Sequence, residues 1–230
     1  MFKKIGLIIL IVAVIGVLGV GGLRVSHRRL TLATGRLQSL KTQVVSLAGS
    51  PQRLTIRLRT ARLTVRQGAT NTVALKNVVA NQVRVRQTAQ GVTVTQPQVD
   101  RFRGEIGTTA QVQVTLTAAT LRKLAIYQVN GTLTLRDLTT DRLQVTHLNG
   151  TTRASRLTVK QGGTLTGTNG QVALDQLAVD GLAVTVRTGK IMLDGHRTAH
   201  QKHYRRAGQH PLTIQQGTGQ VHLTAVTAAS

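Results

Sequence analysis

The sequence predicts an all-β fold, a β-solenoid with coils of about 20 residues, and three observations support this prediction. The 230-residue chain is rich in valine, leucine and threonine but has two tyrosines, two phenylalanines and no tryptophan, a composition that favours strands. From Leu54 onward apolar and polar residues alternate in short runs, as they do in half-buried strands. Glycines then recur at a nearly constant spacing, which is typical of stacked coils.

The repeated unit is a short apolar strand, a turn that ends in glycine and, in most copies, a second short strand. The glycines of successive units are 19, 20, 19 and 30 residues apart. Asparagine precedes the first three of them, so we expect asparagine side chains to stack and hydrogen-bond between coils. A meander of hairpins is the alternative, because Asn-Gly is also the strongest short hairpin signal. The predicted structural turns are Asn130, Gly131, Asn149, Gly150, Asn169, Gly170, Gly189 and Gly219.

The clearest copies of the unit lie in residues 131–138, 170–177 and 182–193. Their pattern resembles the bacterial putative-adhesin family of envelope β-solenoid domains, and the resemblance extends over residues 112–223. It implies a right-handed β-helix, a surface or envelope setting and no enzyme chemistry. Family members often carry an acidic residue directly after the turn glycine, so this chain is expected to prefer a different ligand. The corresponding residues here are Thr132, Thr151, Gln171, Lys190 and Gln220.

A short basic tail and a long uncharged run begin the chain. Residues 5–23 carry no charge and would reach about 28 Å as a helix, which is enough to span a bilayer. The run is longer than the apolar core of a cleaved signal peptide and offers a poor cleavage site, so we expect an uncleaved signal anchor. The predicted organisation is a cytoplasmic tail at residues 1–4, a transmembrane helix at 5–23, a stalk or linker at 24–52 and a β-solenoid domain at 53–230.

The charges that flank the apolar run bear on its orientation. Lys3 and Lys4 favour a cytoplasmic N-terminus, whereas Arg24, Arg28 and Arg29 crowd the other flank. A short basic segment followed by an apolar run is how an export signal begins, and the whole downstream chain is basic. We therefore expect a single-pass protein of the cell membrane whose solenoid domain is extracellular.

Thirty lysines and arginines against seven acidic residues give a formal net charge of +23, which indicates an anionic partner. Residues 24–99 hold thirteen of the cations and no carboxylate. Six arginines there occupy the polar positions of strands, so we expect one exposed face that binds phosphate or carboxylate groups. A solvated surface that protects sheet edges is the alternative. These anion-binding candidates are Arg57, Arg59, Arg62, Arg66, Arg84 and Arg86.

The long final glycine spacing comes from residues 194–210, which we expect to form a basic loop inserted between two rungs. Three histidines in it have the i, i+4, i+7 spacing of one helix face, which makes them a weak candidate for a metal site. Basic neighbours would repel a cation, so we predict no metal, no cofactor and a loop that contacts anions. The histidines are His196, His200 and His203, and the anion-binding candidates of the loop are Arg197, Lys202, Arg205 and Arg206.

We do not expect an enzyme. Asp137 and Asp175 recur at matching rung positions and would be the acid and base of a polysaccharide-cleaving β-helix. Polar residues at the turn after each second strand explain the same recurrence, and the chain has no tryptophan for sugar stacking. No catalytic residues are therefore predicted.

These observations favour a protein that binds. The predicted function is that of a membrane-anchored, adhesin-like protein of the cell envelope, whose cationic solenoid contacts anionic wall polymer or lipid headgroups. An envelope scaffold that binds a membrane-protein partner is one alternative. Nucleic-acid binding is another, if the domain is cytoplasmic, because a strongly basic chain has the electrostatic footprint for it.

Overall fold

The computed structural model describes residues 28–31, 36–97, 105–117, 120–198 and 202–229. All regular elements in these residues are strands, which confirms the all-β prediction. The described residues contain no helix with the length and apolar character that a membrane span needs. The predicted tail at residues 1–4 and the predicted anchor at 5–23 lie outside the described residues.

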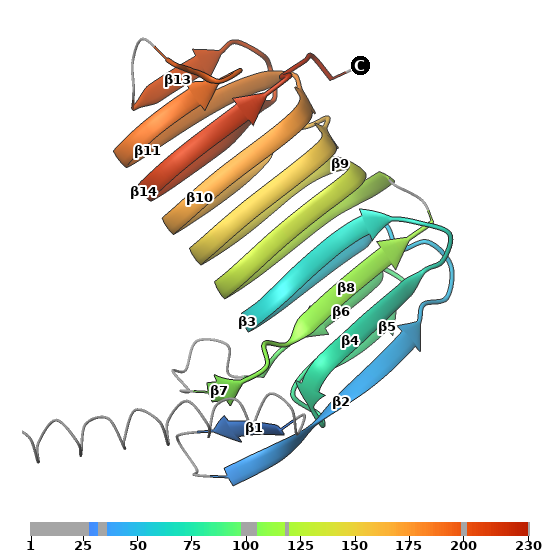
Figure 1. Cartoon of the computed structure of the whole chain (residues 1–230). Helices are drawn as coiled ribbons and strands as arrows, with labels where there is room; N and C mark the ends of the chain where they lie inside the picture. The colour runs from blue at the N-terminus through green and yellow to red at the C-terminus, as the bar shows by residue number, and fades with distance from the viewer. Residues whose placement is uncertain (1–27, 32–35, 98–104, 118–119, 199–201, 230) are drawn as a thin grey trace, which may run out of the picture.

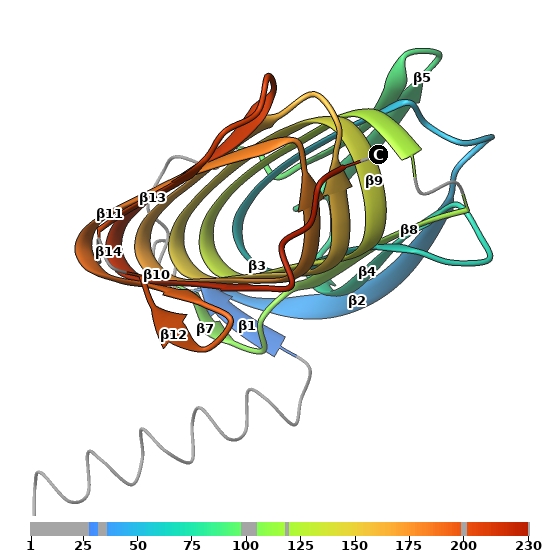
Figure 2. The same cartoon turned by 90° about the horizontal axis from the view of Figure 1, so that it is seen from above.

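Five long strands form the body of the molecule, and they bend around the corners of a solenoid (Figures 1 and 2). Neighbouring strands pair in parallel, as stacked coils require and hairpins do not. β9 runs through 40 residues and contributes two successive coils. The predicted β-solenoid is therefore confirmed. The strands are β3 (Arg53–Gln67), β9 (Thr120–Val159), β10 (Gly163–Val179), β11 (Gly181–Leu193) and β14 (Pro211–Thr224).

Two long walls of each coil meet at a corner. In β3, Leu54 and Ile56 point inward from the first wall, and Leu63 and Val65 point inward from the second. All four side chains are fully buried, while Thr55 and Thr64, each between the two members of a pair, face outward. A fully buried aliphatic side chain of this kind contributes about 1.5–3 kcal/mol. The aliphatic core thus follows from the alternation in the sequence.

Shorter strands continue the walls beyond β3. β6 (Gly91–Thr95) extends the first wall and β8 (Gln111–Leu116) extends the second, each parallel to β3. Antiparallel strands then follow, with β5 beside β6, β4 beside β8, β2 beside β4, and β1 between β2 and β7. These antiparallel strands are β1 (Arg28–Thr31), β2 (Arg36–Ser46), β4 (Thr72–Val79), β5 (Arg84–Thr88) and β7 (Glu105–Gly107).

The described part of residues 24–52 is not the predicted stalk, because β1 and β2 are strands of the sheet. The periodicity of β2 is weak for a physical reason. Its register against β4 shifts between Lys41 and Gln43, and as a strand near the sheet edge it leaves Leu37 and Val44 exposed by 54% and 61%. A strand with one irregular register and two exposed apolar residues lacks the clean alternation that identifies β3.

The C-terminal coils do not stack in sequence order. β14 lies between β10 and β11, so Gly219 pairs with both Gly170 and Gly189. After β11 the chain turns back through β12 (His196–Arg197) and β13 (His203–Arg206), which both pair antiparallel with β11. Residues 194–210 thus join two neighbouring coils, β11 and β14, as predicted, but they form two short strands and not a loop. These strands cap the end of the solenoid, where an open sheet edge would invite other chains to pair.

The Asn-Gly corners form the predicted ladder. The side-chain amide of Asn149 donates to Oδ1 of Asn130 at 3.1 Å, and that of Asn169 donates to Oδ1 of Asn149 at 2.9 Å. Each hydrogen bond joins one coil to the next, so the ladder fixes the register of the stack. This prediction is confirmed.

Buried polar side chains lie inside the same corner, three residues before the turn glycine. Nε2 of Gln128 donates to the backbone carbonyl of Asn130 at 3.0 Å, and Nε2 of Gln216 donates to that of Thr218 at 2.8 Å. His147 occupies the equivalent place in its coil and is 3% exposed. A buried polar group needs a hydrogen-bond partner, and the corner carbonyls supply one for these amides.

His147 makes the stability of the solenoid depend on pH. Its Nδ1 lies 2.9 Å from Oγ1 of Thr152. Burial lowers the pKa of the imidazole, and the backbone of Asn149 partly offsets this effect. The unfolded chain therefore takes up a proton at higher pH than the folded chain does. The free energy of unfolding should fall as the pH decreases below about 6.5, the ordinary histidine pKa.

We expect His147→Gln to remove this decline, because glutamine fills the same position in two other coils and does not titrate. Chemical denaturation followed by circular dichroism at about pH 7 and about pH 5 measures the difference. His203→Gln, at an exposed histidine of β13, is the matched control and should keep the decline. An unchanged pH dependence in His147→Gln would contradict the assignment.

Candidate anion-binding site

The six N-terminal arginines do not form one face. Arg57 lies on the first wall, where β3 pairs with β6, whereas Arg62 and Arg66 lie on the second, where β3 pairs with β8. The chain turns between the walls near residues 59–61, so the alternation continues while the outward direction changes. The predicted single arginine face is therefore wrong. Two further exposed arginines lie on β5 beside the first wall, Arg84 and Arg86.

Two of the six have contacts within the fold. Arg59 is only 6% exposed, and its backbone N–H donates to Oε1 of Gln96 at 2.9 Å. The guanidinium of Arg57 lies 5.1 Å from the centre of the Tyr127 ring, which is a cation–π distance. Arg59 is thus withdrawn from the surface on which it was expected.

Arg206 of the end cap has a structural role. Its guanidinium donates to the backbone carbonyls of Val179 at 2.7 Å, Thr227 at 2.9 Å and Val226 at 3.2 Å. These contacts fasten the segment after β14 to the end of β10. Arg206 was expected to bind an external anion, but its donors are directed at backbone oxygens. Arg197, Lys202 and Arg205 are exposed.

The predicted histidine cluster does not form a helix face. His196 lies on β12 opposite Leu193, and His203 lies on β13 opposite Thr185, so they pair with opposite ends of β11. His200 is outside the described residues. Among the residues that are described, no group of three or more metal-ligating side chains comes together.

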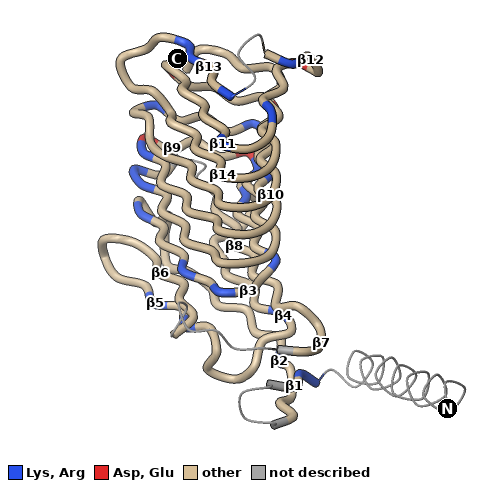
Figure 3. The backbone as a smooth tube through the Cα atoms, turned by 90° about the vertical axis from the view of Figure 1, so that its left-hand side faces the viewer, with Lys and Arg blue, Asp and Glu red and all other residues tan. Residues whose placement is uncertain are grey.

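Exposed cations gather where one coil passes into the next. Arg53 pairs with Lys123 in the neighbouring coil, and the backbone N–H of Lys160 donates to the carbonyl of Thr140 one coil away. In Figure 3 blue segments recur one above another along the left-hand side of the middle coils. We call this group the basic corner, and its exposed members are Arg53, Arg122, Lys123, Arg142 and Lys160.

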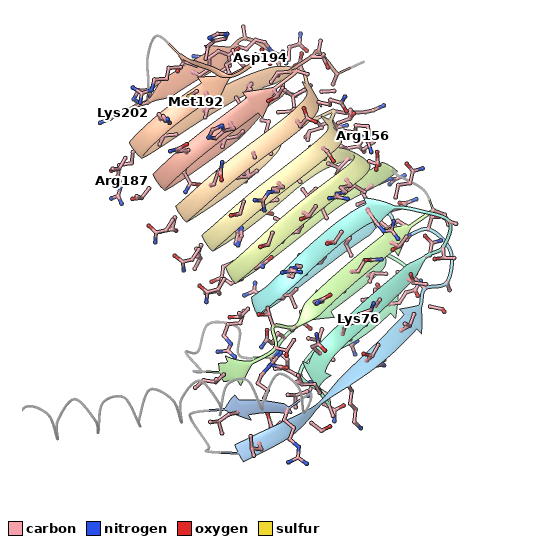
Figure 4. The ribbon with its side chains drawn as sticks, in the orientation of Figure 1. Lys76, Arg156, Arg187, Met192, Asp194 and Lys202 are labelled. Atoms are coloured by element: carbon pink, nitrogen blue, oxygen red, sulfur yellow. The ribbon has the colours of Figure 1, made fainter. Side chains whose placement is uncertain are left out.

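Few carboxylates balance the basic corner. Within residues 120–160 the acidic residues are Asp137 and Asp141. Asp137 lies at another corner, at the end of the second wall, where Arg156 forms a salt bridge with it and so lowers the pKa of its carboxyl. Arg156 is labelled in Figure 4 at that end of the strands. Asp141 is left beside the cations, and Asp180 follows Val179, the partner of Val159, and so lies one coil beyond Lys160. Stacked coils are about 4.8 Å apart, so the basic corner presents a row of positive charge along the solenoid axis.

The basic corner was not predicted, although the sequence contains a signal for it. A basic residue directly precedes the first inward leucine in three successive coils, so the same outward position is charged each time. The three pairs are Arg53-Leu54, Lys123-Leu124 and Arg142-Leu143. Aligning the coils by their inward leucines, as well as by their glycines, would have revealed this row.

Asp137 and Asp175 do not share a rung position. Asp175 pairs with Ser155 in the neighbouring coil, whereas Asp137 contacts Arg156, the residue after Ser155. The two carboxylates therefore belong to adjacent rows of the second corner. The expected match between them is wrong, and the carboxylate of Asp137 is already held by a guanidinium.

Comparisons with known proteins bear on the fold. A family model described as Toastrack DUF4097 matches residues 51–229. No curated protein matches the sequence significantly. A putative cell adhesion protein from Clostridium sporogenes is similar in structure, with a TM-score of 0.62 and 11% identity over 81% of this chain and 99% of that chain.

Two further solved structures are more distant. A putative adhesin from Bacteroides fragilis has a TM-score of 0.40 and 10% identity, over 80% of this chain and 97% of that chain. A putative lipid binding protein from Parabacteroides distasonis has a TM-score of 0.28 and 6% identity, over 83% of this chain and 96% of that chain. At these identities the structural likeness concerns the fold alone. The family match spans the solenoid from β3 to β14 and confirms the resemblance carried by the repeat motifs, and the chain belongs to the Toastrack DUF4097 family.

Proposed function

We propose that this protein is a membrane-anchored, adhesin-like binding protein of the bacterial cell envelope, and that its cationic solenoid contacts anionic wall polymer or lipid headgroups. The observation that carries the proposal is the basic corner, where exposed cations recur from coil to coil. An anchor at residues 5–23, an extracellular solenoid and a right-handed winding belong to the same proposal.

The basic corner is suited to an extended anion. Sheet hydrogen bonds fix the spacing of the coils, so the backbone that carries the cations is ordered before a ligand arrives. A lysine or arginine close to an anionic lipid surface contributes about 1 kcal/mol. Several cations in a row therefore give substantial attraction together, and added salt should reduce it by screening.

The name of one structural neighbour agrees with a binding role. The Clostridium sporogenes protein is called a putative cell adhesion protein. Contact with anionic surface material is a function of that general kind. The net charge of +23 gives such contact an electrostatic basis in this chain.

Binding of polyphosphate to the full chain in neutral detergent micelles tests the proposal. We expect the affinity to fall with added salt, and to fall at least about tenfold when four cations of the basic corner are neutralised. Fluorescence anisotropy of labelled polyphosphate measures both effects. The four substitutions are Arg53→Gln, Lys123→Gln, Arg142→Gln and Lys160→Gln.

A control with the same net charge separates the basic corner from overall charge. It neutralises four exposed cations that lie elsewhere on the solenoid and should keep most of the affinity. Equal losses in the two variants, or binding that does not respond to salt, would overturn the proposal. The control substitutions are Arg28→Gln, Lys41→Gln, Lys76→Gln and Arg187→Gln, at exposed residues that belong to no predicted anion-binding group.

A further inference from the structure

A groove of about 250 Å³ lies on the outer face of the second wall. It crosses both coils of β9 and the strands β10 and β14, and it shares no residue with the basic corner. The second wall faces the viewer in Figure 4, where Met192 is labelled on the neighbouring strand β11. None of the predicted anion-binding residues lines the groove.

The groove results from side-chain sizes in one cross-strand row. Ala173 of β10 pairs with Arg153 of β9 on one side and with His222 of β14 on the other. All three face outward, because Val172 and Leu174 on either side of Ala173 are buried. A short alanine between two long side chains leaves a hollow in the sheet surface.

Two cations and one carboxylate line this hollow. Arg136, Arg153 and Asp175 are exposed there. Among the described residues, none of these three side chains forms a hydrogen bond or a salt bridge, whereas the nearby Asp137 is held by Arg156. Arg136 and Asp175 interact with that pair through charge alone, Arg136 with Asp137 and Asp175 with Arg156. The hydrogen-bonding groups of all three side chains therefore remain open to a ligand, and their charges differ in sign.

We infer that the groove binds an acidic sugar residue of a surface polysaccharide. Arg136 and Arg153 hold the sugar carboxylate, since the planar fork of arginine matches a carboxylate with two parallel hydrogen bonds. Asp175 accepts hydrogen bonds from sugar hydroxyls, and the hydroxyls of Thr134 and Ser155 donate or accept others. This inference rests on the proposed function, because it names the class of anionic polymer that one face of the solenoid recognises.

The mixture of charges selects a sugar acid over two other ligands. A phosphate polymer would bring negative charge against Asp175, which is unfavourable at short range. A neutral sugar would cover two guanidiniums without offering them an anion. A sugar acid carries both a carboxylate and hydroxyls. The groove is also smaller than the roughly 300 Å³ at which pockets for drug-sized ligands begin, which suits a single sugar unit.

Calorimetry on the full chain in neutral micelles tests this inference with three probes: an oligogalacturonate, a neutral oligosaccharide of equal length, and polyphosphate. We expect the oligogalacturonate to bind and the neutral sugar not to bind. Arg153→Gln should weaken oligogalacturonate binding about tenfold, as expected for one charge-assisted pair. Arg187→Gln removes an exposed arginine at the opposite end of the strands from Arg156 (Figure 4) and should leave this binding unchanged.

Asp175→Asn distinguishes recognition from general attraction. If Asp175 binds sugar hydroxyls, the substitution weakens oligogalacturonate binding while it strengthens polyphosphate binding, because a repelling charge is gone. If Asp175→Asn strengthens the binding of both probes, or if Arg153→Gln and Arg187→Gln have equal effects, the inference that the groove recognises a sugar acid is overturned.

The groove and the basic corner can fail separately. If the chain does not bind oligogalacturonate but binds polyphosphate through the basic corner, the inference about the groove is wrong and the proposed function stands. The opposite result is oligogalacturonate binding that depends on Arg153 and Asp175, while the basic-corner substitutions leave polyphosphate binding unaffected. In that case the role of the basic corner is wrong and the sugar-acid site in the groove stands.

Discussion

Gly170→Ala is expected to destabilise the solenoid by at least about 4 kcal/mol, a large part of the stability of an ordinary domain. Gly170 has a φ of +131°, and a Cβ on it would lie 1.8 Å from the carbonyl oxygen of Gly150 in the next coil. The obstructing atom is backbone, so no rotamer change relieves the clash. Moving the coil would break parallel hydrogen bonds to its neighbours. Chemical denaturation followed by far-ultraviolet circular dichroism measures the loss.

Gly195→Ala is the matched control. Gly195 also has a positive φ, +82°, but a Cβ there would meet no atom within 4 Å. This substitution should cost only the strain of a left-handed backbone, about 1–2 kcal/mol. If the two variants lose equal stability, backbone strain and not the close approach of coils explains the glycine at the corner.

Removal of β14 is expected to have the second largest effect. Twelve residues of β14 pair with β10 and twelve with β11, so its loss leaves two strand edges unpaired. It also removes four side chains that are at most 1% exposed, and these contribute about 6–12 kcal/mol by burial. A chain that ends at residue 210 should therefore unfold or aggregate. The four buried residues are Leu212, Ile214, Val221 and Leu223.

A chain that lacks only residues 228–230 is the control for this truncation, and it should keep the wild-type unfolding transition. It retains β14 and the carbonyl of Thr227 that accepts from Arg206. Size-exclusion chromatography and circular dichroism compare the two truncations. A compact, fully stable chain that ends at residue 210 would mean that β11 can pair directly with β10, contrary to this prediction.

The solenoid and its ladder could be predicted because their signals are local. Leu54 and Ile56 alternate with polar neighbours, and Asn149 recurs one coil after Asn130. Each signal lies within a few residues or at a fixed repeat. Burial and register follow from such patterns without knowledge of the rest of the chain.

The order of the coils could not be predicted in this way. Gly189 and Gly219 carry the same local pattern, and either fits beside Gly170. The choice depends on the path of residues 194–210, which return along β11 as an end cap. A repeat period identifies equivalent positions, but it does not say which coils are neighbours in space.

The candidate site was predicted only in part, and the cause of the failure is related. At the first corner of β3, Thr60 and Ala61 occupy the positions that asparagine and glycine hold in the next coil. No local turn signal therefore separates Arg57 from Arg62, and the two were expected on one face. Arg206 was misassigned because its acceptors are backbone carbonyls, which every residue has. The composition indicated exposed cations, but the wall or corner on which each cation lies depends on where the chain turns.

The position of β14 also sets an order of events while the protein is being made. A ribosome releases the chain from its N-terminus, so β10 and β11 emerge before the strand that separates them. Until β14 emerges, β10 and β11 must stay apart, or pair and then separate again. Translocation across a membrane in the same direction would impose the same order. Synthesis up to β11 therefore yields a solenoid that cannot close at its C-terminal end until the next long strand arrives.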